Sequence, residues 1–147
     1  MADKLGNRYE AKWLIRQLLE VIGGRAQFLQ YEGISADFKG FEFAIQKQRV
    51  TEWHQAKISS PHGNWTLAAL EREGVLSAFK SRVLADRESK CVFVSQDAAK
   101  DIWVLAEKSR IATSHEEYLE GLGDGQRRNF ENSLIFGQQI LRRHTFG

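Results

Sequence analysis

The stretch FKGFEFAIQKQRVTEWHQAKI, residues 38–58, decides the fold that we expect of this chain. Two of its segments, Phe38–Ile45 and Val50–Ile58, are rich in the aromatic and β-branched residues that favour strands. The polar segment Gln46–Arg49 separates them and predicts a turn. Ala26–Tyr31 has the same strand-like character and precedes them after a short break that contains glycine. The three segments together predict an antiparallel meander.

A helix is predicted before this meander, over Gly6–Ile22, where Gly23 and Gly24 end it. Its apolar residues recur at spacings of three and four: Leu14, Leu18, Val21 and Ile22. Continuing this row back by one turn places Glu10 on the inner face of the helix. A carboxylate in that position needs a partner.

The chain after the meander predicts more helices and one more strand. Thr66–Ala85 has helical periodicity, and Lys90–Ser95 is a short apolar run typical of a central strand, added in parallel after the helical crossover. Three further helices are predicted: Ala98–Lys108, capped by Asp97; a short helix opened by the capping box of Ser114 and Glu117; and Gln126–Arg143. The order of elements predicts a layered α/β domain with a mixed sheet.

Length and composition indicate one folded domain that spans residues 1–147. Hydrophobic residues make up 42% and charged residues 27%, with a mean hydropathy of -0.44, which excludes disordered and fibrous chains. No apolar run approaches the roughly 18 residues of a membrane span, and Met1–Gly6 lacks a secretion signal. The single cysteine, Cys91, fits a buried, reduced thiol. We therefore expect a cytoplasmic protein, and the abrupt end at Gly147 is compatible with the amino-terminal module of a longer one.

The net charge of +2 does not by itself indicate a nucleic-acid partner. A local basic surface is nevertheless predicted at the carboxyl end, where Gln126–Gly147 holds four arginines against one acid, Glu131: Arg127, Arg128, Arg142 and Arg143. A solvated helix face explains this pattern equally well.

One group of residues predicts chemistry. Strand alternation puts Gln55 and Lys57 on one face, and Asp37 begins the neighbouring strand. With Glu10 from the first helix, this gives an oxygen-rich set suited to Mg²⁺ or Mn²⁺. Two carboxylates about 4 Å apart repel by roughly 1 to 4 kcal/mol, and a divalent cation removes that cost. Its bound water can attack a phosphodiester while Lys57 stabilises the developing charge.

Each of these residues also allows a plainer interpretation. Glu10 could face water at the margin of its helix, and Asp37 could be only a turn residue ahead of a strand. Gln55 and Lys57 could form a solvated strand face. Their joint occurrence in this order is the evidence for a site.

The set resembles the PD-(D/E)XK nuclease superfamily, with Glu10 on a first helix, Glu32 and Asp37 bracketing a turn, and Gln55-Ala56-Lys57 on the next strand. More narrowly, three segments are similar to the double-strand DNA endonuclease modules of bacterial anti-phage systems, as in CBASS effectors and STAND NTPases: Gly6–Glu10, Trp53–Lys57 and Trp65–Leu67. The resemblance implies a restriction-endonuclease-like three-layer core with extra carboxy-terminal helices. It also implies that Asp37, Gln55 and Glu10 bind the metal and that Lys57 is the catalytic lysine.

The function implied is a Mg²⁺-dependent (or Mn²⁺-dependent) endonuclease that cuts double-stranded DNA with low sequence specificity. Such an effector is expected to act as a homo-oligomer, under the control of a fused or partner sensor or NTPase module. A second interpretation follows from Gln55, which stands where the family usually has an acid, and from Ala36 in place of the proline before Asp37. With one negative charge fewer, the domain could serve as a DNA-binding or oligomerisation module. A third interpretation is that the domain cleaves RNA.

Overall fold

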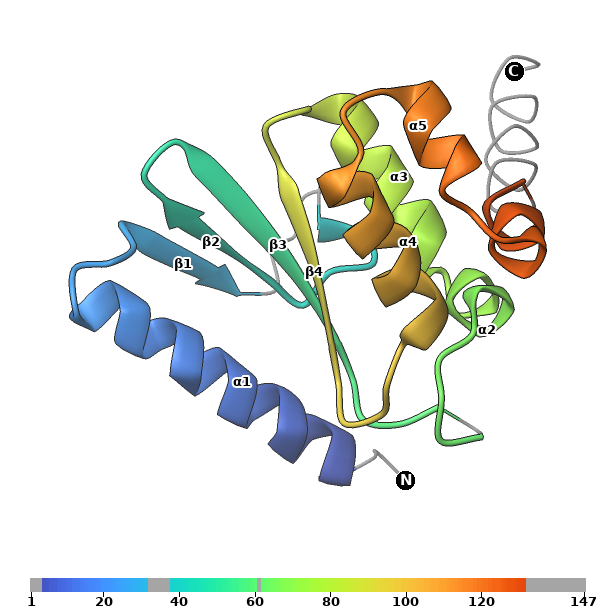
Figure 1. The fold of residues 1–147 in the computed structure, drawn as a ribbon. Coiled ribbons are helices and arrows are strands. Elements are labelled where there is room, and N and C mark those ends of the chain that lie inside the picture. Colours follow the sequence, from blue (N-terminus) through green and yellow to red (C-terminus); the bar gives the residue numbers. More distant parts are fainter. Residues whose placement is uncertain (1–3, 32–37, 61, 132–147) are drawn as a thin grey trace, which may run out of the picture.

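The computed structural model describes residues 4–31, 38–60 and 62–131 of the chain. It confirms a mixed α/β architecture in which helices accompany a four-stranded sheet (Figure 1). Trp53 and His54 are neighbours on one strand and therefore point to opposite faces of this sheet. His54 meets the first helix and Trp53 packs beside Phe79 of the third, so helices cover both faces.

The strands lie in the order β1-β2-β3-β4, in the sequence in which the chain forms them. They span Phe28–Tyr31 (β1), Phe43–Lys47 (β2), Val50–Lys57 (β3) and Lys90–Ser95 (β4). β1 and β2, and β2 and β3, pair antiparallel, whereas β3 and β4 pair parallel. The predicted meander and the parallel addition of the fourth strand are therefore confirmed.

The second strand begins later than the sequence predicts. Phe38–Gly40 forms a tight turn instead, closed by a 2.9 Å hydrogen bond from the amide of Phe41 to the carbonyl of Phe38. Gly40 has a φ of +86°, and a Cβ there would stand 2.7 Å from the Cβ of Ala78. The turn allows Phe38 and Phe41 to pack together against Trp53 in a buried apolar cluster.

The first helix, α1 (Lys4–Ile22), is confirmed, but its predicted inner face is only partly right, because Leu14 and Val21 are half-buried whereas two others are exposed. Leu18 is 44% exposed and Ile22 73% exposed, whereas Gln17 is buried at 6%. Trp13 donates a hydrogen bond to His54 on β3, which directs Trp13 and Gln17 to the sheet. None of the helices in the described part of the chain is long and apolar enough to cross a membrane.

The helix predicted over Thr66–Ala85 is divided into α2 (Leu67–Arg72) and α3 (Val75–Ala85). Gly74, with a φ of +75°, lies between them, because a left-handed residue cannot continue an α-helix. The hydroxyl of Thr66 caps α2 by accepting from the amide of Ala69. The division lets both helices bury apolar residues in one cluster beside β4: Trp65, Ala69, Leu70, Val75 and Phe93.

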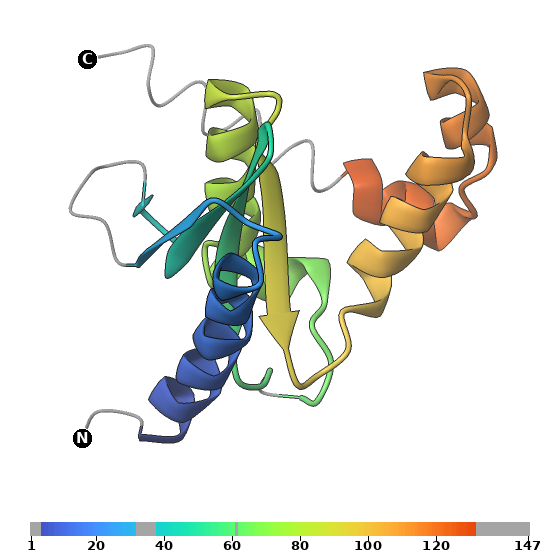
Figure 2. The same ribbon diagram turned by 90° about the vertical axis from the view of Figure 1, so that its left-hand side faces the viewer.

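Beyond β4 the chain forms α4 (Lys100–Ile111), α5 (His115–Glu120) and a helix over 124–131, which stand apart from α1 in Figure 2. The predicted capping role of Asp97 is wrong. Its carboxylate accepts from the amide of Ser60 at 2.7 Å, which joins two loops and leaves Ala99 as the N-cap. Ser114 does cap α5 by accepting from the amide of Glu117, but the Glu117 carboxylate returns to Thr113 rather than to Ser114.

Candidate active site at the end of strand β3

The predicted strand residues lie at the carboxyl end of β3. Gln55 pairs with Phe93 of β4, and Lys57 pairs with Ser95. Gln55 is buried, with 4% of its surface exposed, whereas Lys57 is half-buried. Within the described part of the chain, the side-chain oxygen of Gln55 has no hydrogen-bond partner. A buried amide oxygen without a donor costs roughly 1 to 3 kcal/mol, so this atom is suited to a ligand.

The sequence did not identify Glu42, which immediately precedes β2 and is hydrogen-bonded to β3 beside these residues. Its amide donates to the carbonyl of His54 at 3.0 Å, and its carboxylate accepts from the amide of Ala56 at 2.9 Å. The carboxylate therefore takes the place of a main-chain carbonyl and extends the pairing of the two strands. Glu42 directly precedes Phe43, which pairs with His54, and its two hydrogen bonds flank Gln55 on β3.

Glu42 has an unusual acidity. Burial raises the pKa of its carboxyl to about 7, although the amide of Ala56 and the positive charge of Lys57 lower it. The negative charge of Glu10 raises this pKa further. The charges of Glu10 and Lys57 thus both act on the carboxyl of Glu42, in opposite directions.

Glu10 is held at this end of the sheet by β1. The hydroxyl of Tyr31 donates to the carboxylate of Glu10 at 3.1 Å. Tyr31 is the last residue of β1 and pairs with Phe43, the first residue of β2. This contact gives Glu10 the partner that a carboxylate on the sheet side of a helix requires.

Two predicted acids, Asp37 and Glu32, lie outside the described residues. The structure therefore places Gln55 and Lys57 near the end of β3, with Glu42 bound to the intervening Ala56 and Glu10 bound to Tyr31 at the end of β1. Across residues 4–31, 38–60 and 62–131, no three histidine, cysteine or acidic side chains are grouped closely enough to hold a metal ion. A cation at this position would need an amide or backbone oxygen as well.

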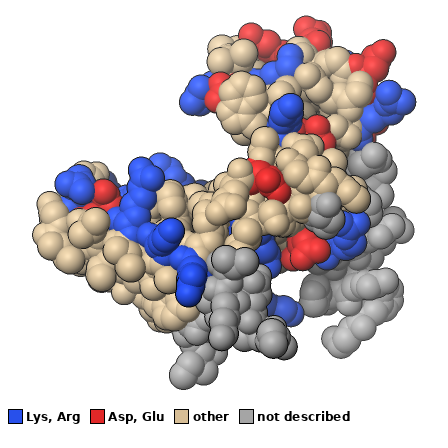
Figure 3. All heavy atoms as spheres, turned by 90° about the horizontal axis from the view of Figure 1, so that it is seen from below, with Lys and Arg blue, Asp and Glu red and all other residues tan. Residues whose placement is uncertain are grey.

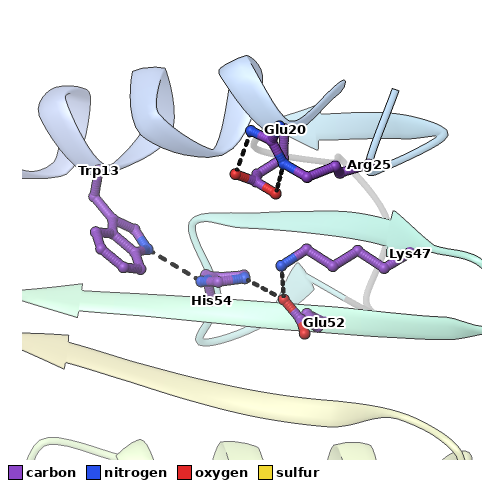
Figure 4. A network of polar contacts seen from close by, with 6 residues as sticks. All are labelled: Trp13, Glu20, Arg25, Lys47, Glu52 and His54. Carbon is purple, nitrogen blue, oxygen red and sulfur yellow. Dashed lines mark hydrogen bonds and ion pairs between the residues drawn. The ribbon is translucent and has the colours of Figure 1, made fainter. Parts of the chain in front are cut away.

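A polar chain beneath the site fixes α1 to the sheet (Figure 4). The indole of Trp13 donates to Nδ1 of His54 at 3.1 Å, and Nε2 of His54 lies 3.6 Å from the carboxylate of Glu52. The same carboxylate binds Lys47 at 2.8 Å. Burial lowers the pKa of His54 to about 4, although the charge of Glu52 raises it. His54 is therefore neutral at physiological pH and serves to position α1, and with it Glu10.

Cys91 offers no alternative chemistry. Burial raises the pKa of its thiol to about 11, so almost no thiolate is present at neutral pH. Its sulfur instead contacts the carbonyl of Phe79 in the core.

Comparison with protein-family models, curated proteins and solved structures found no match. The interpretation of the site therefore depends on its own residues.

Strand alternation alone could not identify Glu42. A signal was nevertheless present, because Glu42 stands between Phe41 and Phe43, which are 7% and 0% exposed. An acidic residue between two aromatic residues of the core must lie at the edge of the core. Partial burial there changes the pKa of its carboxyl, so this sequence pattern is a signal for a functional acid.

Proposed function

We propose that this chain is a metal-dependent endonuclease of the PD-(D/E)XK type that hydrolyses DNA phosphodiester bonds at the end of β3. The observation that carries the proposal is the buried side-chain oxygen of Gln55, which has no partner among the described residues, next to a Glu42 carboxylate that is held on the amide of Ala56. Glu10 comes from α1, whereas Glu42, Gln55 and Lys57 come from the hairpin of β2 and β3 and the residue before it. Such convergence of carboxylates, an amide and an ammonium is typical of a site that handles a charged substrate.

The order of the elements supports the fold that the proposal requires. A helix, an antiparallel meander, a helical crossover and a parallel fourth strand follow one another along the chain. This is the order of the restriction-endonuclease-like core that we infer, with α4, α5 and the helix over 124–131 as additions.

The donor set fits Mg²⁺ or Mn²⁺. Carboxylate and amide oxygens are the ligands that these hard cations prefer, and Glu10, Glu42 and Gln55 supply them here. Asp37, which precedes the turn at Phe38, is the further ligand that we propose. The raised pKa of Glu42 means that its ionised form is poorly compensated within the protein, so a divalent cation would stabilise it. Such an ion supplies charge neutralisation and a bound water.

The residues of the chain have separate roles in this proposal. The ammonium of Lys57 binds a phosphate oxygen and stabilises the charge that develops as water attacks phosphorus. Glu42 holds the amide of Ala56 and so keeps the end of β3 in place. The attacking water passes its proton to solvent, because the Glu42 carboxylate is occupied as a proposed metal ligand. The bond from phosphorus to the sugar oxygen then breaks.

We extend the proposal to the biological setting that the resemblance implies. Double-stranded DNA is the substrate, contacted through its backbone with little base reading. The domain acts as an anti-phage effector, oligomerises when active and depends on a sensor or NTPase module for control.

Gln55 favours one alternative. A buried neutral amide at this position supplies no negative charge, so a domain that binds DNA without cutting it, or that serves for oligomerisation, is the second candidate. Measurements of DNA cleavage and of DNA binding distinguish the nuclease from this second candidate.

The test is incubation of supercoiled plasmid with the purified chain and Mg²⁺ or Mn²⁺. We expect nicked and linear products that disappear with EDTA and in Lys57→Ala. Lys90→Ala removes a lysine from the other end of the sheet, where Lys90 pairs with Glu52 and is exposed, and should cut normally. Equal cleavage by Lys57→Ala would place the site elsewhere. Binding without cleavage in any metal would favour the alternative.

A further inference from the structure

A row of positive side chains runs along α1. Arg8, Lys12 and Arg16 follow one another at intervals of four residues, and all three are exposed. Four residues advance an α-helix by about 6 Å and turn it by about 40° beyond a full revolution. The three cations therefore span about 12 Å within a narrow arc of the helix surface.

The carboxylates of α1 do not neutralise this row fully, because there are two of them for three cations and Glu20 is paired with Arg25. Glu10 accepts from Tyr31, and Glu20 binds Arg25 through hydrogen bonds of 2.8 and 2.9 Å. Lysine and arginine side chains accordingly gather over α1 in Figure 3. Charge is distributed unevenly over the molecule, since α5 has three glutamates among six residues and no lysine or arginine. A polyanion would approach α1 rather than α5.

The row is also held in place. The guanidinium of Arg16 lies 5.2 Å from the centre of the Trp13 ring, a cation–π contact. Trp13 is itself fixed by its hydrogen bond to buried His54. Arg16 is thus ordered before any partner binds, which lowers the entropy lost on binding.

We propose that Arg8, Lys12 and Arg16 form a track for the phosphate backbone of duplex DNA. Each strand of a duplex carries one phosphate per about 3.4 Å of axis, so a 12 Å row faces three or four nucleotides. The row points away from the sheet and Glu10 points toward it, but a helix is only about 10–12 Å across. One turn of duplex, about 34 Å long, can reach both. This inference rests on the proposed function, because it takes DNA to be the substrate.

The carboxy-terminal arginines are a weaker choice for this role. The guanidinium of Arg127 is hydrogen-bonded to the carbonyl of Leu119 at 2.9 Å, so it caps α5 from the following helix. An anionic membrane is the other polyanion that a basic helix could bind. We favour DNA because the exposed aliphatic residues of α1 lie mostly beyond the row, towards its carboxyl end: Ile15, Leu18, Leu19 and Ile22.

The experiment measures binding of a fluorescent short duplex to the full chain in EDTA, from about 50 to 200 mM salt. Each lost phosphate contact reduces the slope of log K against log salt by about 0.9. The triple variant Arg8→Gln, Lys12→Gln, Arg16→Gln should therefore lower the slope by two to three and weaken binding at least about tenfold. Glutamine keeps the helix propensity, and the urea midpoint reports that the variant is folded.

The matched control removes three exposed cations elsewhere, in the variant Arg72→Gln, Arg87→Gln, Lys90→Gln, and should bind within about twofold of the wild type. The track would be overturned if the α1 variant bound DNA as tightly as the wild type, or if the control variant lost as much DNA affinity as the α1 variant. In either case the proposed function would still stand, provided that the wild type cuts DNA. A wild type that neither binds nor cuts DNA would overturn both. The track would also be overturned if the α1 variant lost binding to phosphatidylserine vesicles but kept the DNA affinity of the wild type. The partner of the row would then be an anionic membrane and not DNA.

Discussion

Glu42→Gln should change the pH dependence of folding stability. The wild-type carboxyl has its pKa raised from 4.5 to about 7 by burial. The folded state therefore favours the protonated form of Glu42. The stability that this preference contributes is fully present below pH 4.5 and is lost as pH rises through 7. Glutamine is neutral at every pH and can still accept the hydrogen bond from Ala56. The variant should gain stability relative to the wild type as pH increases.

The size of the effect follows from the shift. One pKa unit corresponds to about 1.4 kcal/mol, so the full shift would be worth about 3 kcal/mol. Glu42 is only half-buried, and solvent screening reduces the expected effect to about 2 kcal/mol. The free energy of unfolding of the variant minus that of the wild type should therefore increase by about 2 kcal/mol between pH 5 and pH 8.

Urea unfolding in EDTA at both pH values measures this difference. Contributions from His54 occur in both proteins and cancel. Glu116→Gln, on the exposed first turn of α5, controls for the loss of one negative charge from the protein. A difference between Glu42→Gln and wild type that stays constant from pH 5 to pH 8 would refute the burial of this carboxyl and its place in the site.

Three further outcomes are expected. Since burial lowers the pKa of His54 to about 4, wild-type stability should fall by up to about 3 kcal/mol from pH 6.5 towards 4, and His54→Gln should lack this slope in acid titrations. Asp37→Ala should abolish plasmid cleavage with an unchanged melting temperature, and unfolding instead would make Asp37 structural. Gln55→Glu should tighten Mg²⁺ binding in calorimetry yet lower metal-free stability, whereas unchanged affinity would remove Gln55 from the site.

The sequence was sufficient where an element is defined by its own residues. Lys90–Ser95 forms β4 with the predicted bounds, and Val50 begins β3 as predicted, because polar residues precede both segments. The sequence was insufficient where distant contacts decide. The turn at Phe38–Gly40 depends on the fit of Gly40 against Ala78 of α3, which no local pattern reveals.

The same distinction applies to the site. Alternation along β3 was enough to put Gln55 and Lys57 on one face, since a regular strand fixes the direction of each side chain. The carboxylate of Glu42 instead accepts from the backbone of a strand 14 residues away, so its role depends on a pairing register. Asp97 was assigned to the wrong partner for a related reason, because the amide of Ser60 competes with the helix end for its carboxylate.

The orientation of α1 joins the fold to the proposed chemistry. Apolar periodicity would have directed Leu18 and Ile22 to the sheet, and burial of two aliphatic side chains stabilises a fold by about 1.5 to 3 kcal/mol each. The chain instead directs Trp13 and Gln17 inward, and Trp13 reaches the buried His54. This orientation also puts Glu10 within reach of Tyr31, at the end of the sheet where Glu42 and Lys57 lie. A helix fixed by a specific polar contact has one defined rotation, whereas an apolar stripe tolerates several. The polar contact therefore fixes the position of Glu10 more precisely than apolar burial would. This gives a physical reason why α1 leaves aliphatic residues exposed.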